Sequence, residues 1–238
     1  MAEGDYVDSW PLTGDNDSPY GITTNGTNIW VVDVDEKVYK YNMVGGYIDS
    51  WPLTGATAAV RGITTDGTNI WTVDWQDRKV YKWGMDGTPI DSWPLDPSLA
   101  LALGIATNGI NIWICDSNTE KVYKSDMSGG PIDSWSLDGD NTSCIGITTD
   151  GTNIWVVDLA DDVVYKYDMG GHFIDSWPLT APNGDAVGIT TDGTSIWVVD
   201  TQDDRVYKYG GPIPAPPGNP LICKPLISHD IINKARIR

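Results

Sequence analysis

Short apolar segments alternate with clusters of Gly, Asp, Asn and Pro along nearly the whole chain. One unit contains four such segments: IDSWPL at 48–53, GITT at 62–65, NIWTVD at 69–74 and KVYKW at 79–83. The segments are rich in β-branched and aromatic residues and are bounded by turn residues, which is the pattern of β-strands. A helical 3.6-residue period is absent, so the pattern predicts an all-β protein.

The four-strand unit occurs five times. The triplet Asp-Ser-Trp ends at Trp10, Trp51, Trp93, Trp135 and Trp177, at intervals of 41 or 42 residues. Ile-Trp recurs at Trp30, Trp71, Trp113, Trp155 and Trp197, and Val-Tyr-Lys recurs at Tyr39, Tyr81, Tyr123, Tyr165 and Tyr207. An Asp-Gly or Asn-Gly pair, which is a hairpin signal, lies before the third strand of each copy. Four strands in about 42 residues are typical of a propeller blade, and five such similar copies indicate recent duplication.

The two ends of the repeat region predict how the ring closes. The chain opens with a lone strand of the Asp-Ser-Trp type, Tyr6–Leu12, and the fifth copy stops after its Val-Tyr-Lys strand. The N-terminal strand is therefore expected to complete the last blade, which gives a closed five-bladed propeller of four-stranded antiparallel blades. The domain prediction is a propeller over 1–209, followed by a Pro-rich linker and a basic tail over 210–238.

Composition restricts the partners. The formal net charge of −18 argues against nucleic acid and against anionic membranes, which both require a basic surface. No run is long enough to span a membrane, and the first residues lack the features of a signal peptide, so a cytoplasmic location is the default expectation. The skew to 12 Trp and 11 Tyr against one Phe follows from copying one unit five times.

The segment 188–209 (GITTDGTSIWVVDTQDDRVYKY) resembles an NHL repeat, in which a Gly-Ile strand and a turn lead to an apolar strand ending in Asp. The resemblance covers residues 6–209 and implies a propeller, but propellers of this kind serve as binding platforms, scaffolds and enzymes. The Pro-Leu, Gly-Ile-Thr and Ile-Trp order is also similar to the streptogramin lyase family. That family's catalytic His and Glu motif has no counterpart in this chain.

Two loops differ in every copy and are expected on the same face of the disc. One joins the third and fourth strands, at 34–36, 75–77, 117–119, 159–161 and 201–203; the other links blades, at 14–20, 55–61, 96–103, 138–145 and 180–187. Aromatic and Arg side chains dominate interface hot spots, so the loops supply partner-binding candidates. These candidates are Tyr20, Arg61, Trp75, Gln76, Asp77, Asn118 and Gln202. Neutral variation of surface loops is the competing explanation.

Other candidates for chemistry have structural explanations. The strand-ending residues Asp33, Asp74, Asp116, Asp158 and Asp200 are expected to accept hydrogen bonds from the following turn. The Ile-Trp residues are expected in the core, whereas the outer Asp-Ser-Trp residues leave a ligand role open. Asp138 and Asp140 are weak candidates for Ca²⁺, and no other metal or cofactor is expected.

The histidines and cysteines offer little more. His172 and His229 have no visible partner for acid–base or metal chemistry. Among the three cysteines, Cys115 is expected to be buried, and Cys144, in a loop, is expected to be the more reactive thiol.

These observations predict a non-enzymatic binding or scaffold propeller that presents its variable loops to a protein or a glycan. One alternative is a self-assembling structural protein whose basic 210–238 tail contacts the acidic propeller of a neighbouring copy. Another alternative is a lyase or hydrolase with a site at the central channel. It would need a cluster of titratable groups in one pocket.

Overall fold

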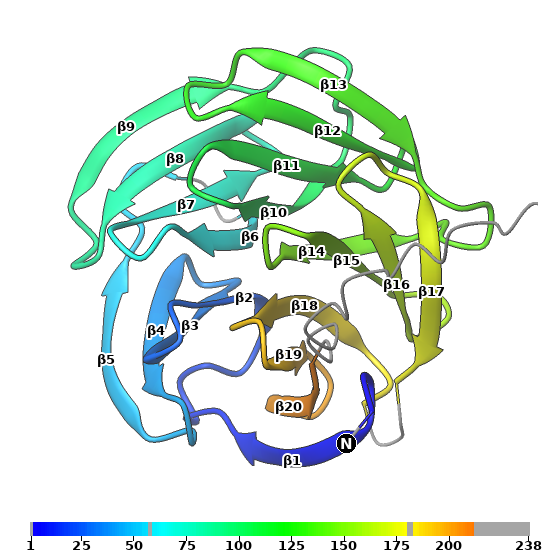
Figure 1. The fold of residues 1–238 in the computed structure, drawn as a ribbon. Helices are drawn as coiled ribbons and strands as arrows, with labels where there is room; N and C mark the ends of the chain where they lie inside the picture. Colours follow the sequence, from blue (N-terminus) through cyan, green and yellow to red (C-terminus); the bar gives the residue numbers. More distant parts are fainter. Residues whose placement is uncertain (1, 57–58, 180–182, 212–238) are drawn as a thin grey trace, which may run out of the picture.

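The computed structural model describes residues 2–56, 59–179 and 183–211. Over these residues the chain forms five four-stranded antiparallel sheets around a central axis, as seen in Figure 1. Blade 1 contains β2 (Pro19–Thr24), β3 (Asn28–Asp33), β4 (Lys37–Asn42) and β5 (Tyr47–Pro52). Blade 2 contains β6 (Val60–Thr65), β7 (Asn69–Asp74), β8 (Lys79–Gly84) and β9 (Pro89–Pro94). The predicted five-bladed propeller is therefore confirmed.

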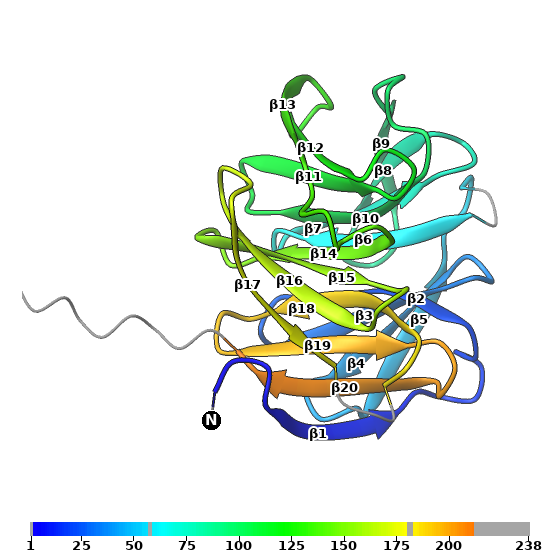
Figure 2. The same ribbon diagram turned by 90° about the vertical axis from the view of Figure 1, so that its right-hand side faces the viewer.

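The remaining blades repeat this plan. Blade 3 contains β10 (Ala102–Thr107), β11 (Asn111–Asp116), β12 (Lys121–Asp126) and β13 (Pro131–Ser136). Blade 4 contains β14 (Cys144–Thr149), β15 (Asn153–Asp158), β16 (Val163–Asp168) and β17 (Phe173–Pro178). Blade 5 contains β18 (Ala186–Thr191), β19 (Ser195–Asp200), β20 (Arg205–Gly210) and the N-terminal strand β1 (Tyr6–Pro11). In each blade the first strand lies next to the axis and the last strand lies at the rim (Figures 1 and 2).

The ring closes through its N-terminal strand, as the sequence predicts. β1 pairs antiparallel with β20, with Asp8 opposite Lys208 and Pro11 opposite Arg205. Two further backbone bonds extend this seam, because Gly4 N donates to Gly210 O and Leu12 N donates to Asp204 O. The last blade thus combines strands from the two ends of the described chain. With β1 in it, each of the five blades has four strands.

The core lies between adjacent blades. The second strand of each blade is buried on both of its faces, because a neighbouring blade covers each side. The five Ile-Trp tryptophans are at most 1% exposed, which confirms that this ring is packing material. The extra Trp83 is also buried, and its Nε1 donates to Thr72 Oγ1 at 3.0 Å, where the other copies have a hydrophobic residue.

The outer Asp-Ser-Trp ring also packs between blades. Trp51 is buried, and the other four side chains of this ring are half-buried. Each of these five indole side chains lies against a positive-φ glycine in the outer turn of the next blade, for example Trp10 against Gly45. A Cβ on that glycine would come within 2.5 Å of the Trp10 ring, so glycine is required by both backbone conformation and space.

One prediction about reactivity is wrong. Cys144 is the first residue of β14 rather than part of an open loop, and it is 1% exposed. A hydrogen bond with Cys115, together with burial, raises the pKa of the Cys144 thiol well above its ordinary value. A thiol in this state is poorly nucleophilic, because the thiolate is the reactive form. Cys115 is buried, as expected.

The predicted 210–238 tail lies outside the described residues, apart from Gly210 and Gly211. The described part of the chain contains no helix long and apolar enough to cross a membrane.

Candidate functional site: the two faces of the propeller

The propeller has two chemically different faces. The loop face carries the loops between the second and third strands of each blade and the links between blades; the turn face carries the short hairpins. Backbone bonds join the two kinds of loop in every blade, for example Val34 N to Ser18 O at 3.1 Å. The prediction that both variable loops share one face is therefore confirmed.

The strand-ending Asp ring holds these loops in place. Asp200 is fully buried, and its Oδ1 accepts hydrogen bonds from the backbone N–H groups of Gln202 and Asp203, each at 2.8 Å. Its Oδ2 accepts from Gly184 N at 3.0 Å and Asp185 N at 3.1 Å, in the link between blades 4 and 5. Asp33, Asp116 and Asp158 connect their own two loops similarly. The ring is structural, as predicted.

The centre of the loop face is formed by five β-bulges. The inner strand of each blade shifts register at one residue near its loop-face end. This bulged residue has no partner in the pairing with the second strand, and the bulge changes the direction of its side chain. The bulged residues are Tyr20, Arg61, Leu103, Ile145 and Val187. Tyr20 and Leu103 pack against the core cluster that contains Ile145 and Val187. The five residues together form what we call the central patch.

Tyr20 and Arg61 are the unusual members of the central patch. The Arg61 guanidinium carbon lies 3.9 Å from the centre of the Tyr20 ring, which is a cation–π contact between blades 1 and 2. The Arg61 side chain also donates to the carbonyl of Val60 at 3.0 Å. Both residues are half-buried, so each keeps surface available to a partner. The structure thus brings together two of the residues that the sequence selects as anchors.

Below the central patch a glycine ring narrows the channel. Gly21, Gly62, Gly104, Gly146 and Gly188 approach one another so closely that a Cβ on Gly188 would lie 2.5 Å from the Tyr20 carbonyl oxygen. The space left among these glycines and the neighbouring isoleucines is about 10 Å³, which is room for about one water molecule. The channel is therefore constricted between its two mouths.

The loops around the central patch are strongly acidic. The ten loops of this face contain 14 Asp or Glu residues and one basic residue, Arg78, whereas the nine turns of the opposite face contain four acidic residues. Burial raises the pKa of Asp33, Asp162 and Asp204, and neighbouring carboxylates add to the rise. Burial and nearby acids also raise the pKa of Tyr39 and Tyr165 to about 12. The central patch thus lies within an anionic rim.

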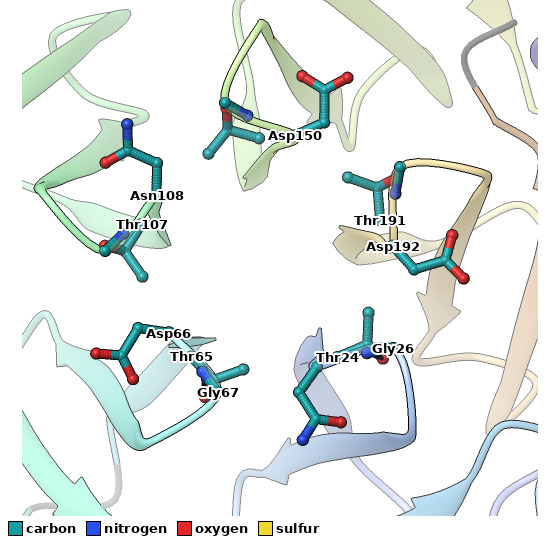
Figure 3. A pocket seen from close by; sticks show the side chains of 15 residues that line it. Thr24, Gly26, Thr65, Asp66, Gly67, Thr107, Asn108, Asp150, Thr191 and Asp192 are labelled. Atoms are coloured by element: carbon teal, nitrogen blue, oxygen red, sulfur yellow. Dashed lines mark hydrogen bonds between the residues drawn. The ribbon is translucent and has the colours of Figure 1, made fainter. Parts of the chain in front are cut away.

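The turn face contains an open vestibule of about 500 Å³ around the axis (Figure 3). One Thr-Asx-Gly turn from each blade lines it, for example Thr65, Asp66 and Gly67. Asp66 Oδ1 accepts from the N–H groups of Thr68 and Asn69, and the labelled Asx side chains point away from the centre of the ring (Figure 3). These carboxylates stabilise their own turns.

The other sequence candidates lie on the loop face but in separate blades. Trp75 (37% exposed) and Gln76 are in the β7–β8 loop, while Asn118 and Gln202 are exposed in the loops of blades 3 and 5. Asp77 accepts a hydrogen bond from the Tyr81 hydroxyl at 2.6 Å, which gives it a structural role as well.

The weak calcium candidates lie in the link between blades 3 and 4. Asp138 Oδ1 accepts from Asp140 N at 3.4 Å, within their own turn. Nowhere in residues 2–56, 59–179 and 183–211 do three His, Cys, Asp or Glu side chains gather as a metal site would require. Calcium binding by Asp138 and Asp140 therefore stays a prediction without added support.

Sequence reasoning missed three features. The first is the difference in acidity between the faces, which a count by loop would have found. The second is a contact between His172 Nδ1 and Asp168 Oδ2 at 2.9 Å, signalled only by four-residue spacing. Both of these side chains are exposed, at 83% and 45%. The third is Glu3, which lies outside the repeats and binds Trp155 and Lys166 in blade 4.

Comparison with known proteins places the chain by its fold. No protein-family model matches it, and no curated protein sequence matches it either. Among solved structures, it resembles the Myxococcus xanthus glutaminyl cyclase with a TM-score of 0.71 and 10% identity, over 85% of this chain and 94% of the other. It resembles a streptogramin B lyase with a TM-score of 0.52 and 19% identity, over 88% and 74% of the two chains.

A third similar structure is a chain of a nidogen–laminin complex, with a TM-score of 0.57 and 23% identity, over 75% of this chain and 70% of that one. These matches confirm the likeness to NHL-like and streptogramin lyase propellers as a likeness of fold. The fold is shared by binding scaffolds and by enzymes, so the site must decide the function.

Proposed function

We propose that this protein is a non-enzymatic binding module whose loop face binds a protein partner with a basic surface. The observation that carries the proposal is the arrangement of the loop face: the central patch, with the Tyr20–Arg61 contact, lies inside loops with 14 acidic residues and one basic residue. A central apolar and aromatic anchor inside a polar rim is the usual anatomy of a protein interface.

Charge favours a basic partner. Clustered carboxylates attract cationic surfaces over roughly a Debye length of about 8–10 Å, and they repel acidic ones. Burial, and after it repulsion from neighbouring carboxylates, raises the pKa of Asp33, Asp162 and Asp204, which shows how densely acids are placed on this face. Lys or Arg side chains of a partner would offset the repulsion among the exposed acids of these loops. A neutral glycan would not interact with this charge, so a basic protein is the better-supported partner of the two.

The channel mouths support a binding role over catalysis. The vestibule is lined by five copies of one turn, and its carboxylates are engaged with their own backbones. In the central patch Arg61 is a cation, and the other four residues have no carboxylate, thiol or imidazole that could act as an acid, base or nucleophile near neutral pH. A hydrolase or lyase would require an acid and a base directed at one point, and the described residues at the two mouths do not offer that pairing.

The test begins with selection of peptides that bind the wild-type full-length chain from a random display library. The proposal expects sequences in which Lys or Arg flank an apolar or aromatic residue. Tyr20→Ala should weaken binding of these peptides about 30-fold, because loss of a hot spot costs about 2 kcal/mol. Isothermal titration calorimetry measures the change.

Matched variants separate specific rim charge from net charge. Asp35→Asn/Asp140→Asn/Asp161→Asn neutralises three exposed acids of the loop face, and Asp49→Asn/Asp91→Asn/Asp133→Asn neutralises three exposed acids of the outer strands. The first triple should weaken binding and flatten its salt dependence, while the second should leave both unchanged. Equal effects of the two triples, or selected peptides without basic residues, would refute the proposal.

A further inference from the structure

Each blade contains a Trp and a Lys side by side on neighbouring strands. Trp113 in β11 lies opposite Lys124 in β12, and Lys124 Nζ is 5.5 Å from the centre of the Trp113 ring. The other pairs are equivalent, at 5.1–5.5 Å: Trp30–Lys40, Trp71–Lys82, Trp155–Lys166 and Trp197–Lys208. All five lie near the turn-face end of their strands. Each pair combines an indole N–H donor with an ammonium group.

In blade 4 this pair holds a carboxylate. Trp155 Nε1 donates to Glu3 Oε1 at 2.8 Å, and Lys166 Nζ donates to Glu3 Oε2 at 2.7 Å. The Lys166 and Glu3 side chains are 14% and 21% exposed, so the ion pair is mostly shielded from water. Each carboxylate oxygen has its own charged or polar donor, which is favourable geometry for a carboxylate.

In the other four pairs the described part of the chain provides the donors but no acceptor. The Nε1 atoms of Trp30, Trp71, Trp113 and Trp197 are buried and have no hydrogen-bond partner among the described residues. These tryptophans are 0–1% exposed. Unpartnered buried donors are rare because their lost hydration is not replaced. The same residue pair is thus satisfied once, by Glu3, and unsatisfied in four places.

We infer that the Trp–Lys pair is a carboxylate-binding unit, and that the four pairs without Glu3 bind carboxylates of ligands at the turn face. This site is on the opposite face from the proposed protein-binding surface and does not depend on it. The ligand chemistry is a carboxylate group, whether of a small organic acid or of a Glu or Asp side chain in a peptide.

The outer turns identify which pair is easiest to test. The Gly4 turn packs against Trp177 of blade 4, and the Gly171 turn packs in the same way against Trp135 of blade 3. Gly170 is therefore the counterpart of Glu3 and lies before the Trp113–Lys124 pair. It has no side chain and no positive φ, so a glutamate can be introduced there without a strained backbone, but its Cβ would lie 3.2 Å from Asp168 Oδ1, which has to move slightly. Gly170→Gln has the same Cβ contact.

The remaining outer turns explain why no described turn residue fills the other pairs. Val44 and Ser128 occupy the equivalent positions in blades 1 and 3, and neither side chain has a carboxylate. Asp86 in blade 2 is one methylene shorter than glutamate, and its Oδ1 accepts from Thr88 N at 3.0 Å within its own turn.

The first test transplants the occupant. Gly170→Glu in the full-length chain should bind Trp113 and Lys124, and it should raise Tm by about 2–4 °C. Gly170→Gln has the same size without the charge and should not raise Tm. In a Lys124→Met background the gain from Gly170→Glu should disappear. If Gly170→Glu is no more stable than Gly170→Gln in the wild-type background, the inference is overturned.

The second test uses free ligands. The indole N–H resonance of Trp113, assigned by its loss in Trp113→Phe, is followed by NMR while sodium acetate or a hexaglutamate peptide is added. A saturable shift that is absent in Lys124→Met supports the inference. A shift with acetate indicates that small carboxylates suffice, and a shift with hexaglutamate alone indicates an acidic peptide. If neither probe moves the resonance, the ligand-binding role is refuted, and only the Glu3 contact remains.

Discussion

The buried carboxylate of Asp200 is the clearest test of how the loop face is held. It accepts four backbone hydrogen bonds, two from the β19–β20 loop and two from the link between blades 4 and 5. Asp200→Asn retains one acceptor oxygen but replaces the other with an amide that faces the N–H groups of Gly184 and Asp185. Two charge-assisted bonds are then lost, at about 1.5–3 kcal/mol each before relaxation of the loops. We expect a net cost of about 2–4 kcal/mol.

Chemical denaturation of the full-length chain measures this cost, and Asp192→Asn is the matched control. Asp192 is an exposed Asx residue on the turn face, and blades 1 and 3 already have Asn25 and Asn108 at its position. Both variants remove one negative charge, so global repulsion changes equally. Asp192→Asn should leave stability unchanged within error. If Asp200→Asn were as stable as Asp192→Asn, the assignment of the Asp ring as the structural anchor of the loops would be incorrect.

Three further predictions concern stability and reactivity. Glu120 has a positive φ of 53°, so Glu120→Gly should stabilise the protein by about 1 kcal/mol in denaturant unfolding; a loss would show that the left-handed backbone is not strained. Because burial raises the pKa of Asp33, Asp162 and Asp204 in the folded state, that state binds protons that the unfolded chain releases, and stability falls as pH rises through the interval from about 4 to the raised values. Tm should therefore rise as pH is lowered from 7 through the raised pKa values towards about 4, and added salt should raise Tm at pH 7; a steady fall over that whole interval would contradict this. Cys144 should react with a thiol reagent only after denaturation, and fast labelling of the native protein at this residue, found by mass spectrometry, would refute its burial.

The sequence predicts the ring because its strongest signals are repeated. A fixed interval between Asp-Ser-Trp triplets determines the blades, and the lone strand that contains Trp10 determines how they close. The Ile-Trp and Asp rings also follow, because a residue copied to every blade is usually required for packing or turns.

Features outside the repeat were less predictable. Glu3 lies before the first strand, so its contact with Trp155 across 152 positions has no local signal. The Tyr20–Arg61 contact depends on a bulge that aims equivalent side chains at the axis, and strand alternation alone does not reveal it. Cys144 lies where a variable link becomes a buried strand, and a boundary error of two residues changed its expected environment.

The most direct test of the binding proposal is a hydrogen-exchange footprint of the full-length chain with a selected basic peptide bound. The proposal predicts slower exchange in the loops of the loop face, centred on 18–21 and 60–62 around Tyr20 and Arg61, with the turns that line the vestibule unchanged. Protection confined to the turn face, or spread evenly over both faces, would contradict the assignment of the acidic loop face as the binding surface.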